Sequence, residues 1–339
     1  MSTGGARWAP SLICSPSQPQ ITVYRYQVFG QRLLSELPFP ELREAPPGAA
    51  TWTFRLEEPA EPPAQVDEAL LGQQTIYPGC QARLFARADG WRIVVDDTGI
   101  YDLRDGGRDI RWTRFPLGTL DFGRAHLLGR VLSTAMHFGG GLVLHGSAVS
   151  YPAGAVVFLA PKHTGKSTLA LALTQAGARL ITDDTITVAL PRPGTPEVWP
   201  GVHSLRLLPD TVERLQATPR RPHADGKVLV TDLRPEQLEE GVRPVAAIYL
   251  LAAAQSIAGG GPVDRRPMPQ PLAAAALVGQ GKISEMLGAA EAPVLLQRAA
   301  RLASHVPVYR LAVQRDFDRL HEVAAQLAQW HSVAPGRPV

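Results

Sequence analysis

Lysine is scarce in this chain. Of the 34 lysine and arginine residues among its 339 amino acids, only four are lysines, at positions 162, 166, 227 and 282. The basic character therefore rests on arginine, and each lysine in this sequence is a candidate for a specific role. The net charge is also small, +3, which argues against a surface built to bind a polyanion. We accordingly expect no nucleic-acid partner.

Cysteines and long apolar runs are few as well. Cys14 and Cys80 are the only cysteines, which suggests neither a disulfide framework nor a zinc cluster. The longest apolar run, residues 245–254, is far too short to span a bilayer, and no apolar stretch behind basic residues marks a signal peptide. From these absences we expect a cytoplasmic protein with no membrane partner.

The remaining composition is that of a globular chain, with 45% hydrophobic and 19% charged residues, long enough for one large domain or two. We expect a flexible Ser/Pro/Gly-rich N-terminus over residues 1–20, a strand-rich lobe over 21–118 and an α/β domain over 119–332. Aromatic and β-branched runs broken by turn signals predict the strands of the first lobe. These are residues 21–28, 51–56, 81–86, 91–95 and 110–114.

In the α/β domain an apolar stripe predicts a helix over residues 120–138. Two apolar runs follow, 142–149 and 155–159, and their short connection through Pro152 predicts a hairpin and hence a mixed sheet. The further predicted elements are strands at 180–182, 185–190, 245–251 and 308–313, a Gly/Pro-rich loop at 256–271, and a closing helix at 316–330 capped by Asp316.

The motif with the clearest chemistry follows the run at 155–159, where residues 160–168 read APKHTGKST. The pattern GxxxxGK[ST] wraps nucleotide phosphates in backbone N–H groups, while its lysine reaches the β and γ oxygens and its hydroxyl binds Mg²⁺. Gly165, Lys166 and Ser167 fill the diagnostic end, whereas Ala160 replaces the first glycine. Nucleotide-binding residues are therefore predicted at His163, Thr164, Gly165, Lys166, Ser167 and Thr168.

The flanks agree with this interpretation. Residues 169–176 are strong helix formers, and Gly177 is a plausible stop, so strand, loop and helix occur in the order that a phosphate site needs. The helix N-terminus adds its positive dipole end to such a site. A Gly-Lys-Ser turn without a ligand is the alternative.

Two neighbouring carboxylates, Asp183 and Asp184, follow the short apolar run after this helix. An acid at a strand end in this place holds Mg²⁺ in phosphate-loop proteins, and a second one can accept the proton of an attacking hydroxyl. We assign the metal to Asp183, together with Ser167, and the proton to Asp184. A polar turn between two strands is the alternative.

Other polar residues carry weaker signals. His145 lies on the apolar run before the loop strand and could reach the phosphates, although the sequence alone favours a hydrogen-bonded core histidine. Asp210 begins a capping-box-like pattern and is interpreted as structural. Four basic residues flank a turn-rich loop and are candidates for holding phosphate or substrate, unless the loop is simply solvated. They are Arg206, Arg220, Arg221 and Lys227.

The chain resembles a known family at these motifs. LHGSAV at 144–149, the phosphate loop, LITDD at 180–184 and PGVHSLRLLPD at 200–210 occur in the order seen in HPr kinase/phosphorylase. They look still more like the HPr-kinase-like enzymes of bacterial peptide biosynthesis, including lasso peptide kinases. The departures from the family pattern are Ala160, Lys162 and His163, which stand where it usually has Gly, Ser and Gly.

The resemblance implies a phosphate-loop domain with a mixed sheet, related to phosphoenolpyruvate carboxykinase, and phosphoryl transfer to a serine-type hydroxyl. It also implies catalytic roles for Lys166, Asp184 and His145. We therefore predict a kinase that uses ATP or GTP with Mg²⁺ and acts on a peptide or small protein. A small-molecule kinase and a nucleotide-gated regulatory protein remain the alternatives, the latter favoured by Ala160 and His163. The oligomeric state stays open, a homo-oligomer included.

Overall fold

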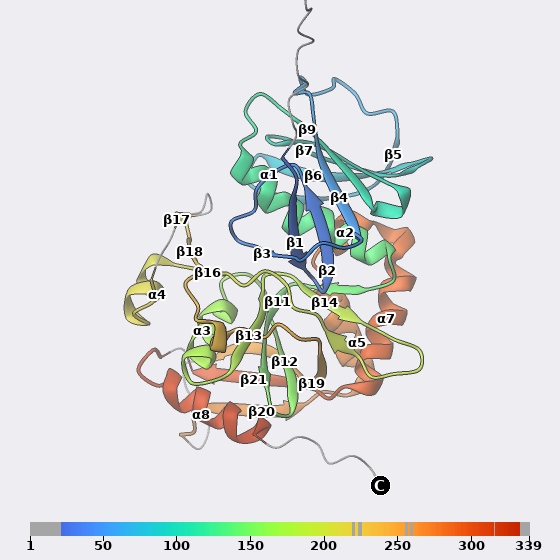
Figure 1. Ribbon diagram of the computed structural model, residues 1–339. Helices are drawn as coiled ribbons and strands as arrows, with labels where there is room; N and C mark the ends of the chain where they lie inside the picture. Colours follow the sequence, from blue (N-terminus) through green and yellow to red (C-terminus); the bar gives the residue numbers. More distant parts are fainter. Residues whose placement is uncertain are drawn as a thin grey trace, which may run out of the picture.

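Two nine-stranded sheets, one above the other in Figure 1, form the framework of the protein. The computed structural model describes residues 22–218, 221–222, 226–254, 257, 260–314 and 316–332. The first sheet has the strand order β3-β1-β2-β4-β9-β8-β7-β6-β5 and uses only residues before position 115. The second is built from later residues and carries the phosphate loop. The fold is therefore α/β with mixed sheets, as predicted.

The first sheet contains the five strands that the sequence predicted and four more. Alternate residues such as Leu84, Ile93 and Trp112 face the interior and are almost fully buried. The strands are β1 (Tyr24–Val28), β2 (Gln31–Ser35), β3 (Arg43–Glu44), β4 (Trp52–Glu57), β5 (Ala69–Tyr77), β6 (Cys80–Arg87), β7 (Gly90–Val95), β8 (Gly99–Arg104) and β9 (Asp109–Arg114). The predicted strands at 21–28 and 51–56 are confirmed to within a few residues, except that residue 21 lies outside the described residues.

A continuous helical segment packs beneath this sheet, as predicted for residues 120–138. It consists of α1 (Leu120–His126), a π-helical stretch η2 (Leu127–Val131) and α2 (Leu132–Phe138). One hydrophobic core contains residues of the first sheet, of this segment and of the second sheet. Burial from both sides explains why nearly every residue from 127 to 137 is apolar or small, with Arg130 and His137 the exceptions.

The second sheet has the order β10-β14-β15-β19-β12-β11-β13, with β21 added beside β19 and β20 beside β21. β12 is parallel to β19 and antiparallel to β11, so the predicted mixed sheet is confirmed. Its strands are β10 (Leu142–Leu144), β11 (Gly146–Tyr151), β12 (Gly154–Leu159), β13 (Arg179–Asp183), β14 (Ile186–Ala189), β15 (Glu197–Val198), β19 (Arg243–Ala254), β20 (Val263–Pro267) and β21 (Val308–Gln314).

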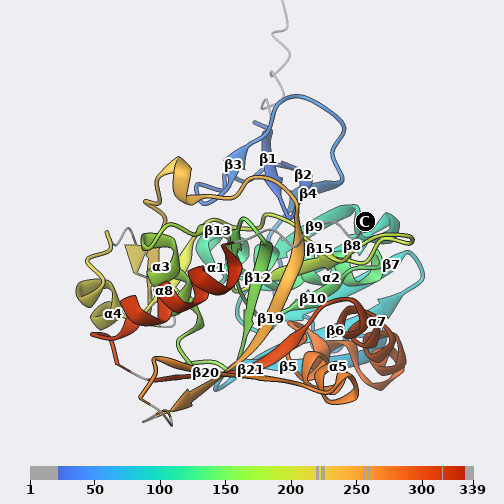
Figure 2. The same cartoon turned by 90° about the horizontal axis from the view of Figure 1, so that it is seen from below.

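Helices cover both faces of the second sheet (Figure 2). Along β12, Val157 and Leu159 enter the core shared with the first sheet, whereas Val156 and Phe158 enter a second core beneath α3 and α8. Burial on both faces accounts for the unbroken apolar run of this strand. The helices are α3 (Lys166–Gln175), α4 (Pro209–Arg214), α5 (Gln270–Gly279), α6 (Ser284–Leu287), α7 (Ala292–His305) and α8 (Leu320–His331).

A small third sheet lies beside α4. It consists of β16 (Leu205–Leu207), β17 (Arg221–Pro222) and β18 (Val228–Val230). Because Leu205, Leu207 and Val230 are buried in the core beneath α3, this sheet holds the segment around Arg206 against the phosphate-loop helix.

Several predicted elements were wrong in detail. The run 142–149 is broken at His145, because β10 pairs with β14 whereas β11 pairs with β12. The expected loop at 256–271 contains β20, which pairs with β21 through residues that alternate too little to predict a strand. The last helix begins at Leu320 and not at Asp316, whose carboxylate accepts from the Asp318 N–H in a preceding turn.

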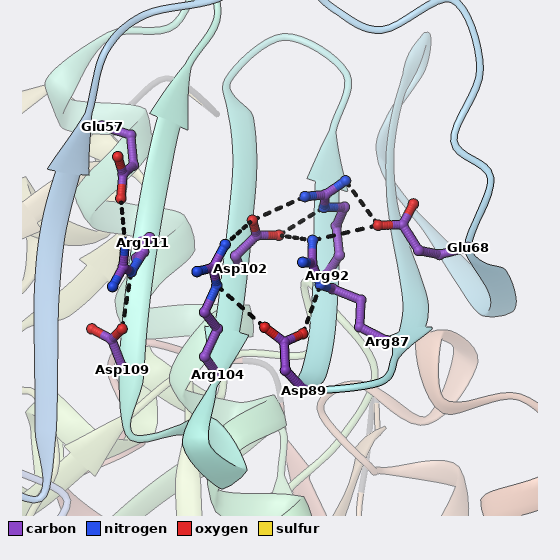
Figure 3. Close-up of polar contacts among 9 residues, drawn as sticks. All are labelled: Glu57, Glu68, Arg87, Asp89, Arg92, Asp102, Arg104, Asp109 and Arg111. Carbon is purple, nitrogen blue, oxygen red and sulfur yellow. Dashed lines mark hydrogen bonds and ion pairs between the residues drawn. The ribbon is translucent and has the colours of Figure 1, made fainter.

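The outward face of the first sheet is charged rather than covered by helices (Figure 3). Asp102 accepts from Arg92 Nε at 2.7 Å and Nη2 at 2.9 Å, and from Arg87 Nη1 at 3.2 Å. Arg111 donates to Asp109, two residues earlier on β9, and to Glu57 on the neighbouring strand β4. Partly exposed pairs of this kind add little stability each. These pairs make much of this sheet face polar, although Phe85, Val94 and Phe115 form a small apolar cluster on it.

The two sheets meet at a glycine that has no room for a side chain. Gly30, in the turn between β1 and β2, donates to the Pro200 carbonyl at 3.2 Å and has a φ of +68°. A Cβ atom there would overlap the indole ring of Trp199. The turn therefore fixes the first lobe against the segment that leads to Arg206.

We expect Gly30→Ala to lower the free energy of unfolding by about 3 kcal/mol or more, since it combines ring overlap with a left-handed φ. Gly79→Ala is the matched control, because Gly79 has a φ of +85° but no atom within 4 Å of a built Cβ. That control is expected to lose only about 1 kcal/mol. Urea unfolding measures both, and equal losses would refute the close approach at Trp199.

Within the described residues, no helix is both long and apolar enough to cross a membrane.

Candidate active site

The phosphate loop and both aspartates lie at one edge of the second sheet. β12 and β13 both pair antiparallel with β11, so they run in the same direction and end at the same edge. β11 runs the other way, which brings His145, just before its first residue, to that edge too. Ligands bind in α/β sheets at such carboxyl ends. The topology therefore gathers residues that are widely separated in the sequence.

The loop itself joins β12 to α3 in the predicted order. Gly165 precedes the first helical residue with a φ of +96°, and His163 has a φ of +65°, so the histidine adopts a conformation that favours glycine. Ala160 does not have a positive φ, and its methyl group therefore imposes no such strain. The Lys166 ammonium, which is buried, donates to the carbonyls of Ala160 at 2.9 Å and Pro161 at 3.1 Å.

Asp183 is buried and faces the start of α3. Its carboxylate accepts from the Ser167 hydroxyl at 3.0 Å, from the Ser147 hydroxyl, and from the Arg206 backbone N–H at 3.3 Å. Burial raises the pKa of this carboxyl, and the hydrogen bonds from the two serines oppose the rise. Ser167 and Asp183 thus present two oxygen atoms side by side.

Asp184 faces a cluster of cations. It has a φ of +70°, and its carboxylate contacts Lys282 Nζ at 2.7 Å and Arg206 Nη1 at 3.7 Å. Burial alone would raise its pKa, but Lys282, Arg206 and His145 together hold the pKa well below the usual range. Asp184 is therefore ionised at neutral pH, and its left-handed backbone turns it away from its neighbour Asp183.

His145 is held in one tautomer. Its Nδ1 lies 3.0 Å from the Asp184 backbone carbonyl, which can only accept, so Nδ1 carries the proton and Nε2 is left as an acceptor. Burial and the charge of Lys282 lower the pKa of His145 to about 3. The imidazole is therefore neutral at physiological pH. His145 lies beside Asp184, between β10 and β11, whereas the sequence had predicted that it lies on a strand.

One cavity of about 1130 Å³ contains this whole group of residues. All four lysines of the chain line it, although two of them come from distant parts of the sequence. On one side the cavity is lined by residues of β5, in the first lobe, and by residues of α1 and η2, in the helical segment beneath the first sheet. The predicted residues that line it are His145, His163, Thr164, Gly165, Lys166, Ser167, Thr168, Asp183, Asp184, Arg206 and Lys227.

The cavity differs in character at its two ends. Beyond the loop, towards β19 and β21, its lining includes Leu208, Leu251, Val313 and Phe317. On the side of β13 it is lined by charged groups. Apolar residues of the cavity therefore gather on the side of β19 and β21, together with Gln314 and Asp316, and form what we call the apolar recess. The part on the side of β13, around Asp184, is the charged recess.

Sequence reasoning missed two residues of the charged recess, Lys282 and Arg130. The scarcity of lysine could have pointed to Lys282. Arg130 could have been recognised because it is the only charged residue in an otherwise apolar helical stretch. Asp210 does line the cavity, but it is the second residue of α4 and forms no capping box. Arg220 lies outside the described residues, and of Arg221 only the backbone, in β17, is described.

Comparisons with known proteins add little to this geometry. No protein-family model and no curated protein sequence matches the chain. Among solved structures the chain is similar to the HPr(Ser) kinase/phosphatase from Coxiella burnetii, with 13% identity and a TM-score of 0.31. The match covers 56% of this chain and 96% of that one. A likeness at this TM-score carries no argument about fold or activity, so the chemistry rests on the site itself.

Proposed function

We propose that the protein is an ATP- or GTP-dependent kinase that phosphorylates a Ser or Thr hydroxyl of a peptide or small protein. The observation that carries the proposal is the placement of Ser167 Oγ 3.0 Å from Asp183 Oδ1 at the N-terminus of α3, directly after a phosphate-loop sequence. A hydroxyl and a carboxylate in this position are the usual protein ligands of Mg²⁺ in nucleotide sites.

The residues present fit Mg²⁺. Both donors are oxygens, as this ion prefers, and a Mg²⁺ ion bound with a nucleotide needs only one or two carboxylates because water and phosphate complete its shell. No cluster of three or more His, Cys, Asp or Glu side chains suited to a metal occurs in the part of the chain that is described, which agrees with such a sparse set. When bound, Mg²⁺ supplies charge neutralisation between the phosphates.

The chain's own residues account for the remaining steps. Lys166 lies at the loop and can leave its two carbonyl acceptors for the β and γ oxygens of the nucleotide. Asp184, which is ionised, accepts the proton of the acceptor hydroxyl as its oxygen bonds to the γ-phosphorus and the bond to the β-phosphate oxygen breaks. Arg206 and Lys282 hold Asp184 in place, and His145 Nε2 offers a second acceptor beside it.

The apolar recess suits the nucleotide base. Leu208, Leu251, Val313 and Phe317 surround a space next to the loop, and an aromatic ring with aliphatic neighbours favours a flat heterocycle. With the base on this side, the γ-phosphate is directed towards Asp184 and the charged recess, where an acceptor can approach from the first lobe.

Calorimetry with Mg-ATP and Mg-GTP tests the nucleotide site, and mass spectrometry of serine-containing peptides, free serine and simple sugars incubated with Mg-nucleotide tests the transfer. We expect binding and a mass increase confined to peptides. Phosphorylation of a free amino acid or sugar instead would favour the small-molecule kinase. Nucleotide binding without any transfer would favour the regulatory protein, and no binding of either nucleotide would refute all three.

A further inference from the structure

The charged recess contains a cation that the chemistry described above does not use. Arg130, on η2 in the helical segment beneath the first sheet, lines the cavity. Its Nε donates to Gln74 Oε1 at 3.2 Å, and its Nη1 lies 3.5 Å from His126 Nδ1. No carboxylate of the described residues lies within ion-pair distance of its guanidinium. Burial lowers its pKa, but an arginine stays charged at neutral pH.

A second cation is tied to Arg130 through Gln74. The Gln74 side chain, from β5, accepts from Arg130 and also lies 3.5 Å from the backbone carbonyl of Lys282, to which its amide donates. The Lys282 ammonium in turn contacts Asp184 at 2.7 Å. The two lobes therefore meet in a chain of polar contacts that runs from Arg130 to the group proposed to accept the hydroxyl proton.

Arg130 has no carboxylate partner among the described residues of this recess. Arg206 and Lys282 both contact Asp184, whereas Asp183 and Glu285, the other carboxylates here, form no ion pair with Arg130. A partly buried arginine without a carboxylate partner is stabilised by an anionic ligand, and arginine binds carboxylate and phosphate through two parallel hydrogen bonds.

There is also space for such a ligand beside Arg130. Gly129 lines the cavity, and a Cβ atom built on it meets no atom within 4 Å. Arg130, Phe122 and Ile76 line the same cavity. Arg130 thus borders a partly apolar cavity, which a small organic anion can enter.

We propose that Arg130, together with Lys282, binds an anionic group, a carboxylate or a phosphate, that the phosphoryl acceptor carries close to its hydroxyl. This inference rests on the proposed kinase function and names the class of its acceptor. An anion held between Arg130 and Lys282 brings the neighbouring hydroxyl to Asp184, which Lys282 also contacts. Arg130 is then a substrate-binding residue supplied by the helical segment beneath the first sheet, and the junction of this segment with the second sheet determines specificity.

Two matched pairs of probes test the proposal. N-acetylserine and N-acetylserinamide differ by a carboxylate, and glycerol 1-phosphate and glycerol differ by a phosphate. Each is titrated by calorimetry into protein saturated with Mg-ADP, so that the phosphate loop is already filled. We expect at least one anionic probe to bind about tenfold or more tightly than its neutral counterpart, the size of a charged hydrogen bond.

The variants identify the site of this preference. Arg130→Gln is expected to abolish it, and Gly129→Leu to weaken it by filling the space while keeping the charge. Arg124→Gln is the control, because Arg124 lies on the adjacent helix α1, pairs with Asp121 and does not line the cavity. Thermal melting shows whether each variant is folded. If Arg130→Gln does not fold, the result for Gly129→Leu tests the proposal instead.

The outcomes separate this inference from the kinase proposal. Preference for the carboxylate probe identifies an acceptor with a carboxylate, and preference for the phosphate probe identifies a phosphorylated one. The inference is wrong if Mg-ADP binds but neither anionic probe is preferred, or if folded Arg130→Gln keeps the preference. In both cases the proposed nucleotide site is not affected. If Mg-ADP itself does not bind, the same probe pairs are titrated without nucleotide. The tighter binding of the anionic probe should then persist in Lys166→Met and be lost in Arg130→Gln.

Discussion

Replacing Lys166 with methionine is expected to abolish detectable Mg-nucleotide binding and to lower kcat/KM for phosphoryl transfer by about a thousandfold or more. Methionine has a similar length but no charge, so the variant removes the only buried ammonium group at the start of α3 in the described residues. Burial lowers the pKa of Lys166, although its neighbours Asp183 and Asp184 oppose this and favour the charged form. Phosphate oxygens would replace its present contacts to the loop carbonyls.

Lys162→Met is the matched control for this experiment. Lys162 belongs to the same loop and lines the same cavity, but it is exposed. An exposed cation near the phosphates contributes weakly, so we expect a loss of no more than about tenfold. Calorimetry and steady-state kinetics measure both variants, with melting curves to confirm folding. A folded Lys166→Met protein that binds Mg-ATP like the wild type would contradict the phosphate-loop assignment.

The sequence could predict the strand, loop and helix of the proposed phosphate site because their determinants are local. The apolar strand, the residues APKHTGKST and the helix formers all occur within about twenty consecutive positions, and backbone preferences act over such distances. The same holds for Asp183 and Asp184, which end the next strand. A site formed by one βα unit and the following strand can therefore be predicted from a single sequence.

The rest of the charged recess could not be predicted because it depends on pairing over long distances. Lys282 contacts Asp184 across 98 residues, and the position of Lys282 depends on α5. That helix has the sequence QPLAAAALVG, whose apolar residues surround it without a clear polar face, so periodicity gives no signal. His145 was placed on a strand because apolar residues at 142–144 and 148–149 flank it, and only the pairing of β10 with β14 shows the break.

Arg130 illustrates the same limit. Its helix was predicted correctly, yet the residue that it faces, Gln74, lies on β5, a strand that the sequence did not reveal. The nine residues of β5 lie at the edge of the first sheet and are mostly exposed or half-buried. A strand of this kind lacks the strict alternation of a strand with one buried face.

The two neighbouring aspartates are expected to lose different functions when each is replaced by asparagine. Asp183→Asn keeps an oxygen for the serines but removes the charge beside Ser167, so binding of nucleotide should weaken and require more Mg²⁺. Asp184→Asn removes the proton acceptor, so kcat should fall by about a hundredfold or more while nucleotide affinity stays nearly unchanged. Its cations Lys282 and Arg206 would also lose their partner, which should lower the melting temperature.

Asp210→Asn supplies the control for both variants. Asp210 lines the same cavity, but its carboxylate accepts from the backbone N–H and the hydroxyl of Thr211, which an amide oxygen can also do. We therefore expect it to change neither Mg²⁺ dependence nor kcat appreciably. Mg²⁺ titrations at fixed nucleotide and single-turnover kinetics distinguish the roles. If Asp184→Asn kept wild-type turnover while Asp183→Asn lost turnover alone, the roles would be reversed, and Asp183, with its raised pKa, would be the proton acceptor.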